Sequence, residues 1–303
     1  MGTSVEVEAS GGDLPGRQAA IDEAFAAIAE VDRLMSNYRK DSELSHVNEL
    51  AGHQAVAASA PLLDVLEAAQ RVSARSRGAF DVTVGPLISL WGFYTKIPHV
   101  PTPAELAAVR PLVDYRNIVI DRTQRTVRFT RDGVAIDLGG IAKGFAVELA
   151  ANVLRRHGLS GFIDAGGNQY LLGTPPDKAA WTVGVKNPDA RDRLLGVIET
   201  PETSVSTSGE YANFVMINGR AYGHILDPRT LQPSTAALSV TVLSRDGTLA
   251  DAVSTAAFLL GPTAGLDLID SFDNMSGVIA YRKPDGGIGL TMSPRLRSAF
   301  HPS

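Results

Sequence analysis

Hydrophobic residues recur along this chain at two spacings, one typical of helices and one typical of strands. Apolar side chains three and four positions apart predict four long amphipathic helices. Glycines that favour helix ends follow two of them, at Gly78 and Gly158, and Gly261-Pro262 stops a third. We predict these helices at residues 15–38, 61–77, 142–157 and 249–261.

Alternation of apolar and polar residues predicts strands between these helices. Two pairs of strands have the pattern of hairpins, and the second pair turns at Asn218-Gly219, a strong hairpin signal. Thr102, Pro103 and Glu105 mark the start of a further helix with a capping box. We predict strands at residues 1–10, 117–121, 126–130, 134–138, 238–244, 276–282 and 287–293, with a hairpin at 214–226.

The order of these elements indicates the fold class. Helices and hairpins follow each other without a βαβ rhythm, which favours an α+β fold with largely antiparallel or mixed sheets and packed helices. No stretch is rich enough in Gly, Pro or Ser to act as a linker. We therefore expect a single domain over residues 1–303, which could consist of two tightly packed subdomains.

Composition and charge exclude several classes of function. The 303 residues have a formal net charge of −5 and no basic stripe, so we expect no nucleic-acid partner. The absence of cysteine excludes disulfides, thiolate catalysis and cysteine-ligated metals. No apolar run approaches about 18 residues, so we expect no membrane span. The first ten residues lack the pattern of a signal peptide, which is expected of a cytoplasmic protein or of one whose targeting segment has been removed.

The stretch DLGGIAKGF at residues 137–145 combines an acid, three glycines and a lysine between a predicted strand and a predicted helix. Gly139 and Gly144 have the spacing of a phosphate-binding P-loop, but Phe145 stands where that motif has its lysine. The glycines do not match the dinucleotide motif G-x-G-x-x-G either. The residues alone leave two interpretations open, a phosphate-binding turn and a plain connection from strand to helix.

Three further groups of residues could carry chemistry. Asp251 and Thr255 lie four positions apart on one predicted helix face, as oxygen ligands of Mg²⁺ could, or as an exposed acid and a packed threonine. His224 precedes a proline turn and is either a catalytic base or a structural histidine. Residues 78–87 form either a wall for a planar ligand or a turn from helix to strand.

Eight motifs in a fixed order show which family the chain is similar to. They are MGT (1–3), MSNY (35–38) followed by DSELSHVN, GAFDVTVGPL (78–87), DLGGIAKGF (137–145), IDAGGNQYLLG (163–173), STSGEY (206–211), YGHILDPRT (222–230) and LADAVSTAAFLLG (249–261). Through these motifs the chain resembles the ApbE family of FAD:protein FMN transferases over nearly its whole length. The resemblance implies an ApbE-like, T-fold-related architecture and an enzyme that uses FAD as a substrate.

The resemblance also implies roles for residues at the matching positions of this sequence. His224 is the candidate proton acceptor. A Mg²⁺ ion would be held by the backbone carbonyl of Gly140, the carboxylate of Asp251 and the hydroxyl of Thr255. Flavin and adenine contacts would come from Met1, Tyr38, Ala79, Phe80, Asp81, Asp137, Lys143 and Ile225. The phosphate near DLGGIAKGF would then be the pyrophosphate of FAD.

In the family reaction, a threonine hydroxyl of a target flavoprotein attacks the FMN phosphorus of FAD, and AMP leaves. The implied partner carries a motif of the type Asp-x-x-Thr-Gly-Ala-(Ser/Thr) and is expected to be a subunit of a membrane redox complex. Family members work outside the bacterial cytoplasmic membrane, so the resemblance implies a periplasmic location.

Two other functions would use the same residues. A Mg²⁺-dependent FAD pyrophosphatase would release FMN and AMP with water as the nucleophile. A non-catalytic flavin carrier or assembly factor would use Asp251 and His224 for binding alone. Four positions depart from the family pattern, and at Leu231, where glycine is usual, we expect a reshaped turn; the other three are Phe145, Glu148 and Asn168.

Overall fold

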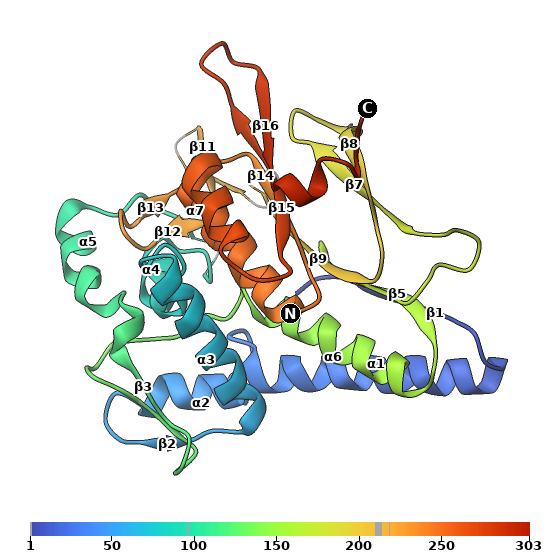
Figure 1. The fold of residues 1–303 in the computed structure, drawn as a ribbon. Coiled ribbons are helices and arrows are strands. Elements are labelled where there is room, and N and C mark those ends of the chain that lie inside the picture. The colour runs from blue at the N-terminus through green and yellow to red at the C-terminus, as the bar shows by residue number, and fades with distance from the viewer. Residues whose placement is uncertain (1, 96, 210–213, 218) are drawn as a thin grey trace. The chain divides into compact units, whose positions relative to one another are not determined.

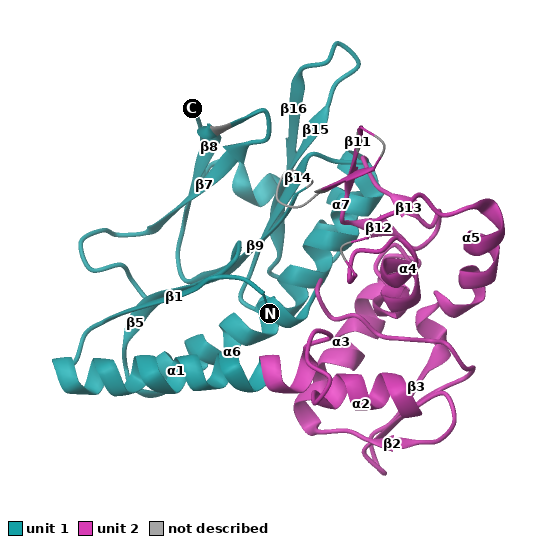
Figure 2. Cartoon of the chain, turned by 180° about the vertical axis from the view of Figure 1, so that it is seen from behind, with its two compact units in different colours: residues 1–31, 141–209, 236–303 teal, residues 32–140, 210–235 magenta. Residues whose placement is uncertain are grey.

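The computed structural model describes residues 2–95, 97–209, 214–217 and 219–303. Helices alternate with antiparallel sheets along the described chain (Figure 1), which confirms the predicted α+β class. The chain divides into two compact units (Figure 2). Unit 1 contains Met1–Val31, Ile141–Gly209 and Ala236–Ser303, and unit 2 contains Asp32–Gly140 and Glu210–Thr235. The single-domain arrangement stays a prediction.

The centre of unit 1 is a sheet of seven strands in which all neighbouring pairs are antiparallel. The hydrophobic pattern predicts its outer strands and β14 but misses β5, β6 and β9. In β9 the pattern is weak because small hydroxyl residues, Ser204 and Ser206, occupy buried positions. The order of the strands is β1 (Val5–Ser10), β5 (Ser160–Ala165), β6 (Asn168–Leu172), β9 (Thr203–Gly209), β14 (Ser239–Ser244), β15 (Ser276–Arg282) and β16 (Ile288–Met292).

Helices cover one face of this sheet, and a smaller sheet packs on the other. The first face carries α6 (Ala142–Arg156) and α7 (Gly247–Asp270). The helix α1 (Leu14–Met35) follows β1 in the sequence. The smaller sheet has β8 (Ala190–Thr200) between β7 (Trp181–Asn187) and β17 (Phe300–Pro302), after the short helix η4 (Pro294–Leu296). Its core joins the seven-stranded sheet through Leu171, Val183, Val185, Ile198, Val205, Leu243, Val278 and Leu296.

The long helix α7 continues beyond its predicted end. Gly261 has a left-handed φ of 78° and breaks the helix there, as Gly261-Pro262 predicts, but a second helical segment follows to Asp270. In the part of the chain that the structure describes, α7 alone has the length and apolar composition of a membrane span. The helix packs on β9, β14 and β15. Of its most apolar stretch of 18 residues, 61% is buried, as expected of a helix in a protein core.

Unit 2 combines helices and small sheets, and its buried Trp91 donates from Nε1 to the carbonyl of Leu231 at 3.1 Å. The predicted capping box at Thr102 and the predicted hairpins are confirmed, although Asn218 lies outside the described residues. The helices are α2 (Glu43–Leu50), α3 (Ala60–Arg75), η1 (Val82–Val84), α4 (Gly85–Leu90), α5 (Pro103–Val109), η2 (Arg110–Leu112) and η3 (Tyr115–Asn117). The strands are β2 (Val56–Ala57), β3 (Ile118–Asp121), β4 (Thr126–Phe129), β10 (Phe214–Ile217), β11 (Arg220–Gly223), β12 (Leu226–Asp227) and β13 (Gln232–Pro233).

The predicted strand at residues 134–138 is wrong. This segment does not belong to any sheet in the described structure. The side-chain amide of Asn48 accepts the N–H of Ile136 at 2.7 Å and donates to its carbonyl at 2.9 Å. The N–H of Asp137 donates to the carbonyl of Val82 at 2.7 Å. A side chain therefore takes the place of a neighbouring strand, and hydrophobic periodicity cannot reveal such a partner.

The segment after α3 also differs from the prediction. The helix ends at Arg75, two residues earlier than expected, and both Arg77 and Gly78 have left-handed φ angles of 54° and 78°. Residues 78–87 contain the helix η1 and the start of the helix α4, and no strand follows α3 in this segment. The alternative of a turn from helix to strand is therefore wrong.

Leu231 shows how unit 2 accommodates a missing glycine. Its φ of 61° is left-handed, a conformation that costs a leucine about 1–2 kcal/mol. Its N–H donates to the carbonyl of Asp227 at 2.7 Å, and its side chain is fully buried beside Trp91. The turn therefore keeps a backbone that glycine would favour, and burial of the leucine side chain offsets the strain.

Candidate functional site

Asp251 is the centre of a buried polar cluster in unit 1. It lies in the second turn of α7 and is only 3% exposed. Its Oδ2 accepts the backbone N–H of Gly144 at 2.9 Å and lies 3.9 Å from Nζ of Lys143. The side chain of Asn168 is hydrogen-bonded to Asp251 as well. Burial raises the pKa of Asp251 above its ordinary value, while Lys143, Gly144 and Asn168 oppose this shift.

Gly144 allows α6 and α7 to touch at this cluster. An added Cβ at Gly144 would lie 2.1 Å from the carbonyl oxygen of Gly247 and 2.7 Å from Cβ of Asp251. A Cβ on Gly247 would in turn lie 2.8 Å from the carbonyl oxygen of Gly144. The last glycine of DLGGIAKGF therefore brings a backbone N–H within reach of the buried carboxylate. The signal for this role was a glycine inside a predicted helix, where glycine is unfavourable unless packing requires it.

Thr255 follows Asp251 by one helical turn, as the spacing of the two residues predicts. Its Oγ1 lies 3.4 Å from the backbone carbonyl oxygen of Asp251 and 3.3 Å from Oγ of Ser208 on β9. Ser208 also forms a hydrogen bond of 2.8 Å with Oγ of Ser254. Unit 1 thus brings three predicted site residues together, and hydroxyls from the STSG motif on β9 join them.

Two departures from the family pattern lie in or beside this cluster. Asn168 accepts the hydroxyl of Ser206 at 2.5 Å with its Oδ1, which leaves its Nδ2 to donate to Asp251. An ionised acid at this position would have no proton to donate to another carboxylate. Glu148 on α6 accepts the N–H and the hydroxyl of Thr248 at 3.2 and 3.1 Å, so it joins α6 to the first turn of α7.

Asp137 is the centre of a second polar cluster, which lies in unit 2. Its Oδ2 accepts the hydroxyl of Tyr94 at 2.5 Å and Nδ2 of Asn37 at 2.8 Å, and its Oδ1 accepts the N–H of Gly139 at 2.7 Å. The rings of Tyr94 and Tyr38 meet edge to face, with centroids 6.1 Å apart and planes at 83°. Tyr94 therefore joins two predicted FAD contacts, Tyr38 and Asp137. Sequence analysis missed Tyr94 because it lies in a loop outside the motifs.

The predicted FAD contacts Ala79, Phe80 and Asp81 are buried in unit 2. Oδ1 of Asp81 accepts the N–H and the hydroxyl of Thr83 at 2.8 and 2.6 Å, and Oδ2 accepts the N–H of Tyr115 at 2.7 Å. Burial raises the pKa of Asp81 above its ordinary value, and these hydrogen bonds oppose the shift. Because both carboxylate oxygens have partners in unit 2, a ligand would meet this segment chiefly through its backbone.

The remaining predicted residues of unit 2 lie in turns. His224 is exposed at a bend directly after β11, and the half-buried Ile225 accepts the N–H of Ser234 at 3.0 Å with its carbonyl. Gly140 lies in the turn that precedes α6. Met1 lies outside the described residues. The roles of all four stay predictions.

The donors around Asp251 fit a hard divalent cation. Mg²⁺ binds oxygen ligands and is commonly held by one or two carboxylates together with phosphate oxygens of a substrate. Removal of the Asp251 carboxylate from water disfavours its charged form, and a cation beside it would offset that cost. Among the residues described, no three His, Asp or Glu side chains form a metal-binding group by themselves. The fit therefore rests on the Asp251 carboxylate and the Thr255 hydroxyl.

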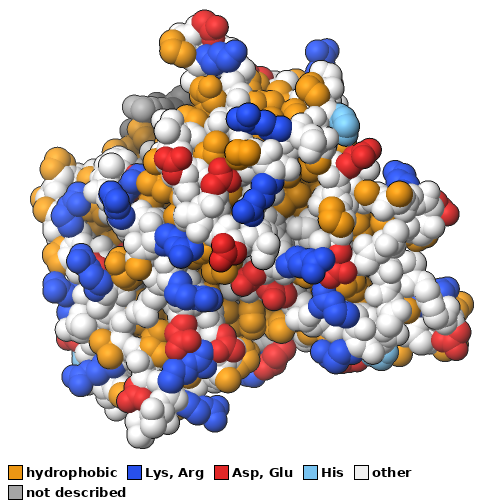
Figure 3. Space-filling model, viewed as in Figure 1, with side chains coloured by type: hydrophobic (Ala, Val, Ile, Leu, Met, Phe, Trp, Pro, Cys, Tyr) orange, Lys and Arg blue, Asp and Glu red, His pale blue; other side chains and the backbone are white. Residues whose placement is uncertain are grey.

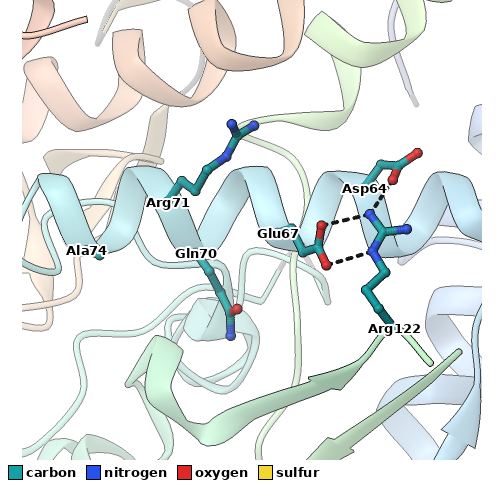
Figure 4. A pocket seen from close by; sticks show the side chains of 6 residues that line it. All are labelled: Asp64, Glu67, Gln70, Arg71, Ala74 and Arg122. Carbon is teal, nitrogen blue, oxygen red and sulfur yellow. Dashed lines mark hydrogen bonds and ion pairs between the residues drawn. The ribbon is translucent and has the colours of Figure 1, made fainter. Parts of the chain in front are cut away.

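A separate hollow in unit 2 lies on α3 and has a volume of about 740 Å³ (Figure 4). Arg122 there holds Glu67 with two hydrogen bonds of 2.6 and 2.7 Å and also pairs with Asp64. Gln70 donates to the carbonyl of Ile118 at 2.8 Å. Two of its acids are thus paired with Arg122, and its described lining contains none of the predicted site residues.

Charged side chains of both signs are interspersed on the face of the protein that Figure 3 shows. This mixture fits the formal net charge of −5. Because charges of both signs are mixed on this face, it has no large region of positive charge that would attract a polyanion from a distance.

Comparison with known proteins decides the family. The family model described as the ApbE family matches residues 1–279. The chain belongs to the ApbE family. This membership confirms the resemblance that the eight ordered motifs indicate. It also explains why these motifs occur along most of the chain.

Curated relatives of this ApbE-family chain carry the name FAD:protein FMN transferase. The protein of Vibrio cholerae is 33% identical over 283 residues, which cover 89% of this chain and 84% of the relative. The protein of Treponema pallidum is 31% identical over 279 residues, which cover 87% of this chain and 77% of the relative.

Solved structures agree with the fold over almost the whole chain. The ApbE protein of Thermotoga maritima has a TM-score of 0.89 at 29% identity and covers 98% of this chain and 96% of its own. The flavin transferase ApbE of Vibrio cholerae has a TM-score of 0.86 at 30% identity and covers 99% and 96%. The expected ApbE-like architecture is therefore confirmed.

Proposed function

We propose that this chain is an FAD:protein FMN transferase that modifies a threonine of a target flavoprotein in the presence of Mg²⁺. The threonine Oγ forms a bond to the FMN phosphorus of FAD, the bond from that phosphorus to the bridging oxygen of AMP breaks, and AMP leaves. The threonine proton passes to a base. The names of the relatives and the buried carboxylate cluster in unit 1 support this reaction.

The Asp251 cluster is the observation that carries the proposal. Phosphoryl transfer needs a fixed geometry and compensation of negative charge more than covalent catalysis. Asp251 is held by a backbone N–H at 2.9 Å and by two further side chains, so its carboxylate has a defined position. Lys143 places a positive charge 3.9 Å from that carboxylate, at the start of α6.

The residues that would hold Mg²⁺ are Asp251, Thr255 and the carbonyl of Gly140. When bound, the ion would neutralise charge on the pyrophosphate and on the departing AMP. Lys143 would bind the same anionic group from the protein side. Tyr38 and the segment from Ala79 to Asp81 would bind the flavin part of FAD, Asp137 and Ile225 would line the same site, and Met1 would complete it.

His224 is the proposed proton acceptor. Its exposed position at the bend after β11 makes it accessible to a hydroxyl that a second protein brings. A correctly placed base contributes typically about 10²–10⁴-fold to such a reaction.

The proposed partner is a flavoprotein subunit of a membrane redox complex that carries the motif Asp-x-x-Thr-Gly-Ala-(Ser/Thr). We place the reaction in the periplasm, where the family resemblance locates such targets. Fractionation of cells that express the natural gene, followed by immunodetection, would test this location.

The decisive experiment incubates the chain with FAD, Mg²⁺ and a peptide that carries the target motif, and mass spectrometry reads the peptide. Addition of FMN to the threonine together with AMP release supports the transferase. AMP and free FMN without modified peptide would support the pyrophosphatase, and bound FAD without AMP would support a flavin carrier. A peptide with valine in place of the threonine is the matched control and should stay unmodified.

A further inference from the structure

The loop after α4 contains a tyrosine that joins two of the proposed FAD contacts within unit 2. Tyr94 donates its hydroxyl to Oδ2 of Asp137 at 2.5 Å, and its ring meets the ring of Tyr38 with centroids 6.1 Å apart. We propose that Tyr94 is a positioning residue for the isoalloxazine ring of FAD, acting through Asp137 and Tyr38. This inference rests on the proposed function, because it takes FAD to be the substrate.

The hydroxyl of Tyr94 helps to fix the Asp137 carboxylate. An ionised carboxylate only accepts hydrogen bonds, so Tyr94 is the donor in this pair. Burial and the charge of Asp137 raise the pKa of Tyr94 far above its ordinary value of 10.0, so the donor proton is retained at neutral pH. Asn37 donates to the same oxygen at 2.8 Å, and its own Oδ1 accepts from Asn48 at 3.3 Å. Side chains from separate segments therefore converge on one carboxylate oxygen.

The ring of Tyr94 restrains a tyrosine that is otherwise mostly in solvent. Tyr38 is 73% exposed, so most of its aromatic surface is accessible to a planar ligand. The two planes meet at 83°, an edge-to-face arrangement that aromatic pairs favour. An exposed side chain loses rotamer freedom when it binds a ligand, and a partner that already restrains it reduces this loss. The contact with Tyr94 therefore prepares Tyr38 for binding.

The loop that carries Tyr94 has a closed geometry of its own. Gly92 has a left-handed φ of 76°, and an added Cβ there would lie 2.2 Å from the carbonyl oxygen of Ile97. The hydroxyl of Thr95 donates to the carbonyl of Gly92 at 3.2 Å. The loop begins at the buried Trp91, whose indole is hydrogen-bonded to Leu231. Tyr94 is thus presented from an anchored segment.

The test separates the two ends of FAD with ligand fragments. Riboflavin contains the isoalloxazine ring without phosphate, and ADP contains the adenine and the pyrophosphate without that ring. Binding of riboflavin and FAD to the full chain is followed by flavin fluorescence, and binding of ADP by calorimetry. Tyr94→Leu should weaken riboflavin and FAD by about tenfold or more and leave ADP unchanged, because it removes both the ring contact and the hydrogen bond.

Tyr94→Phe keeps the ring and removes only the hydroxyl, so it should weaken riboflavin by about threefold, less than Tyr94→Leu does. If Tyr94→Leu does not fold, Tyr94→Phe alone decides. Tyr281→Phe, at a tyrosine of β15 in unit 1 that is not among the proposed FAD contacts, is the control and should bind all three ligands as the wild type does.

Two results would overturn the inference. One is wild-type riboflavin affinity in Tyr94→Phe and in every folded Tyr94 variant. The other is a loss of ADP affinity with riboflavin affinity unchanged, which would place adenine at this tyrosine pair. A wild-type chain that binds flavin but modifies no target peptide would refute the proposed transferase and leave this comparison of ligands intact.

Discussion

Asp251 in unit 1 and Asp137 in unit 2 are both carboxylates of the proposed site, but the protein holds them by different means. Asp251 is buried on a long helix, and its carboxylate accepts a backbone N–H from another helix at 2.9 Å. Asp137 is half-buried in an irregular segment, and a tyrosine hydroxyl at 2.5 Å and an asparagine amide at 2.8 Å hold it from the side.

The difference decides which substitutions each carboxylate tolerates. Around Asp251 the backbones of α6 and α7 touch through two glycines, so added volume at Gly144 must displace a helix. Around Asp137 the contacts to Oδ2 come from side chains, so loss of a single hydroxyl or amide changes the cluster without moving an element. A metal site needs the first kind of support, since ligand positions must be fixed closely, whereas a ring-binding surface can be built in the second way.

The largest effect is expected from Asp251→Ala. Removal of the buried carboxylate should lower Mg²⁺-dependent AMP release by about 10³-fold, since a preorganised charged group is lost from the reaction centre. FAD affinity should fall only moderately, because the contacts in unit 2 remain. The rate at limiting Mg²⁺ is the measurement, and Asp267→Ala, an exposed acid on the same helix, is the control. Wild-type rates in Asp251→Ala would contradict the proposal that Asp251 is a ligand of Mg²⁺.

His224→Asn tests whether unit 2 supplies the proton acceptor of the reaction. Loss of a general base should lower transfer to the target peptide by about 10²-fold, with FAD affinity nearly unchanged. His53→Asn, an exposed histidine of the same unit, should keep the wild-type rate. Equal losses of FAD affinity and rate would make His224 a binding contact, and no loss of either would make it a structural residue.

Gly144→Ala tests the helix contact directly. The added methyl group would overlap the carbonyl oxygen of Gly247, which should destabilise the protein by about 2 kcal/mol and displace Asp251. Thermal unfolding measures the stability, and Mg²⁺ titration of the folded variant measures the site. Gly287→Ala is the control, because its Cβ would meet only the flexible end of Asp285 at 3.1 Å. An unchanged melting temperature in Gly144→Ala would mean that α6 and α7 are less rigidly packed than this contact requires.

The smallest effect is expected from Glu148→Gln and depends on pH. Burial and the nearby Asp246 raise the pKa of Glu148 above its ordinary value of 4.5, so the folded state binds its proton more tightly than the unfolded state does. As the pH falls from 7 toward 4.5, the wild type should therefore gain stability relative to the variant, whose amide does not titrate. Denaturant unfolding at several pH values measures this difference. A difference that is constant with pH would show that Glu148 has no raised pKa.

The sequence allowed prediction of those features that depend on neighbours in the chain. The i, i+4 spacing places Asp251 and Thr255 on one face of α7, and the signals at Thr102 predict a capping box that the structure confirms. The strand β9 escaped prediction because its buried serines are satisfied by partners such as the carbonyl of Gln169, at 2.9 Å from Ser204. A polar residue that finds such a partner looks like a loop residue in the sequence alone.

The sequence by itself therefore determined the fold class, most helices, the family and the chemical types of the proposed site residues, because local spacing and ordered motifs carry that information. Only the tertiary structure decided that Gly144 brings an N–H to Asp251, that Asn168 donates to the same carboxylate, and that Tyr94 joins Tyr38 to Asp137. These contacts join residues from distant parts of the chain. Their geometry depends on how closely two backbones approach and on which donor faces which acceptor. The spacing of residues along one segment determines neither of these.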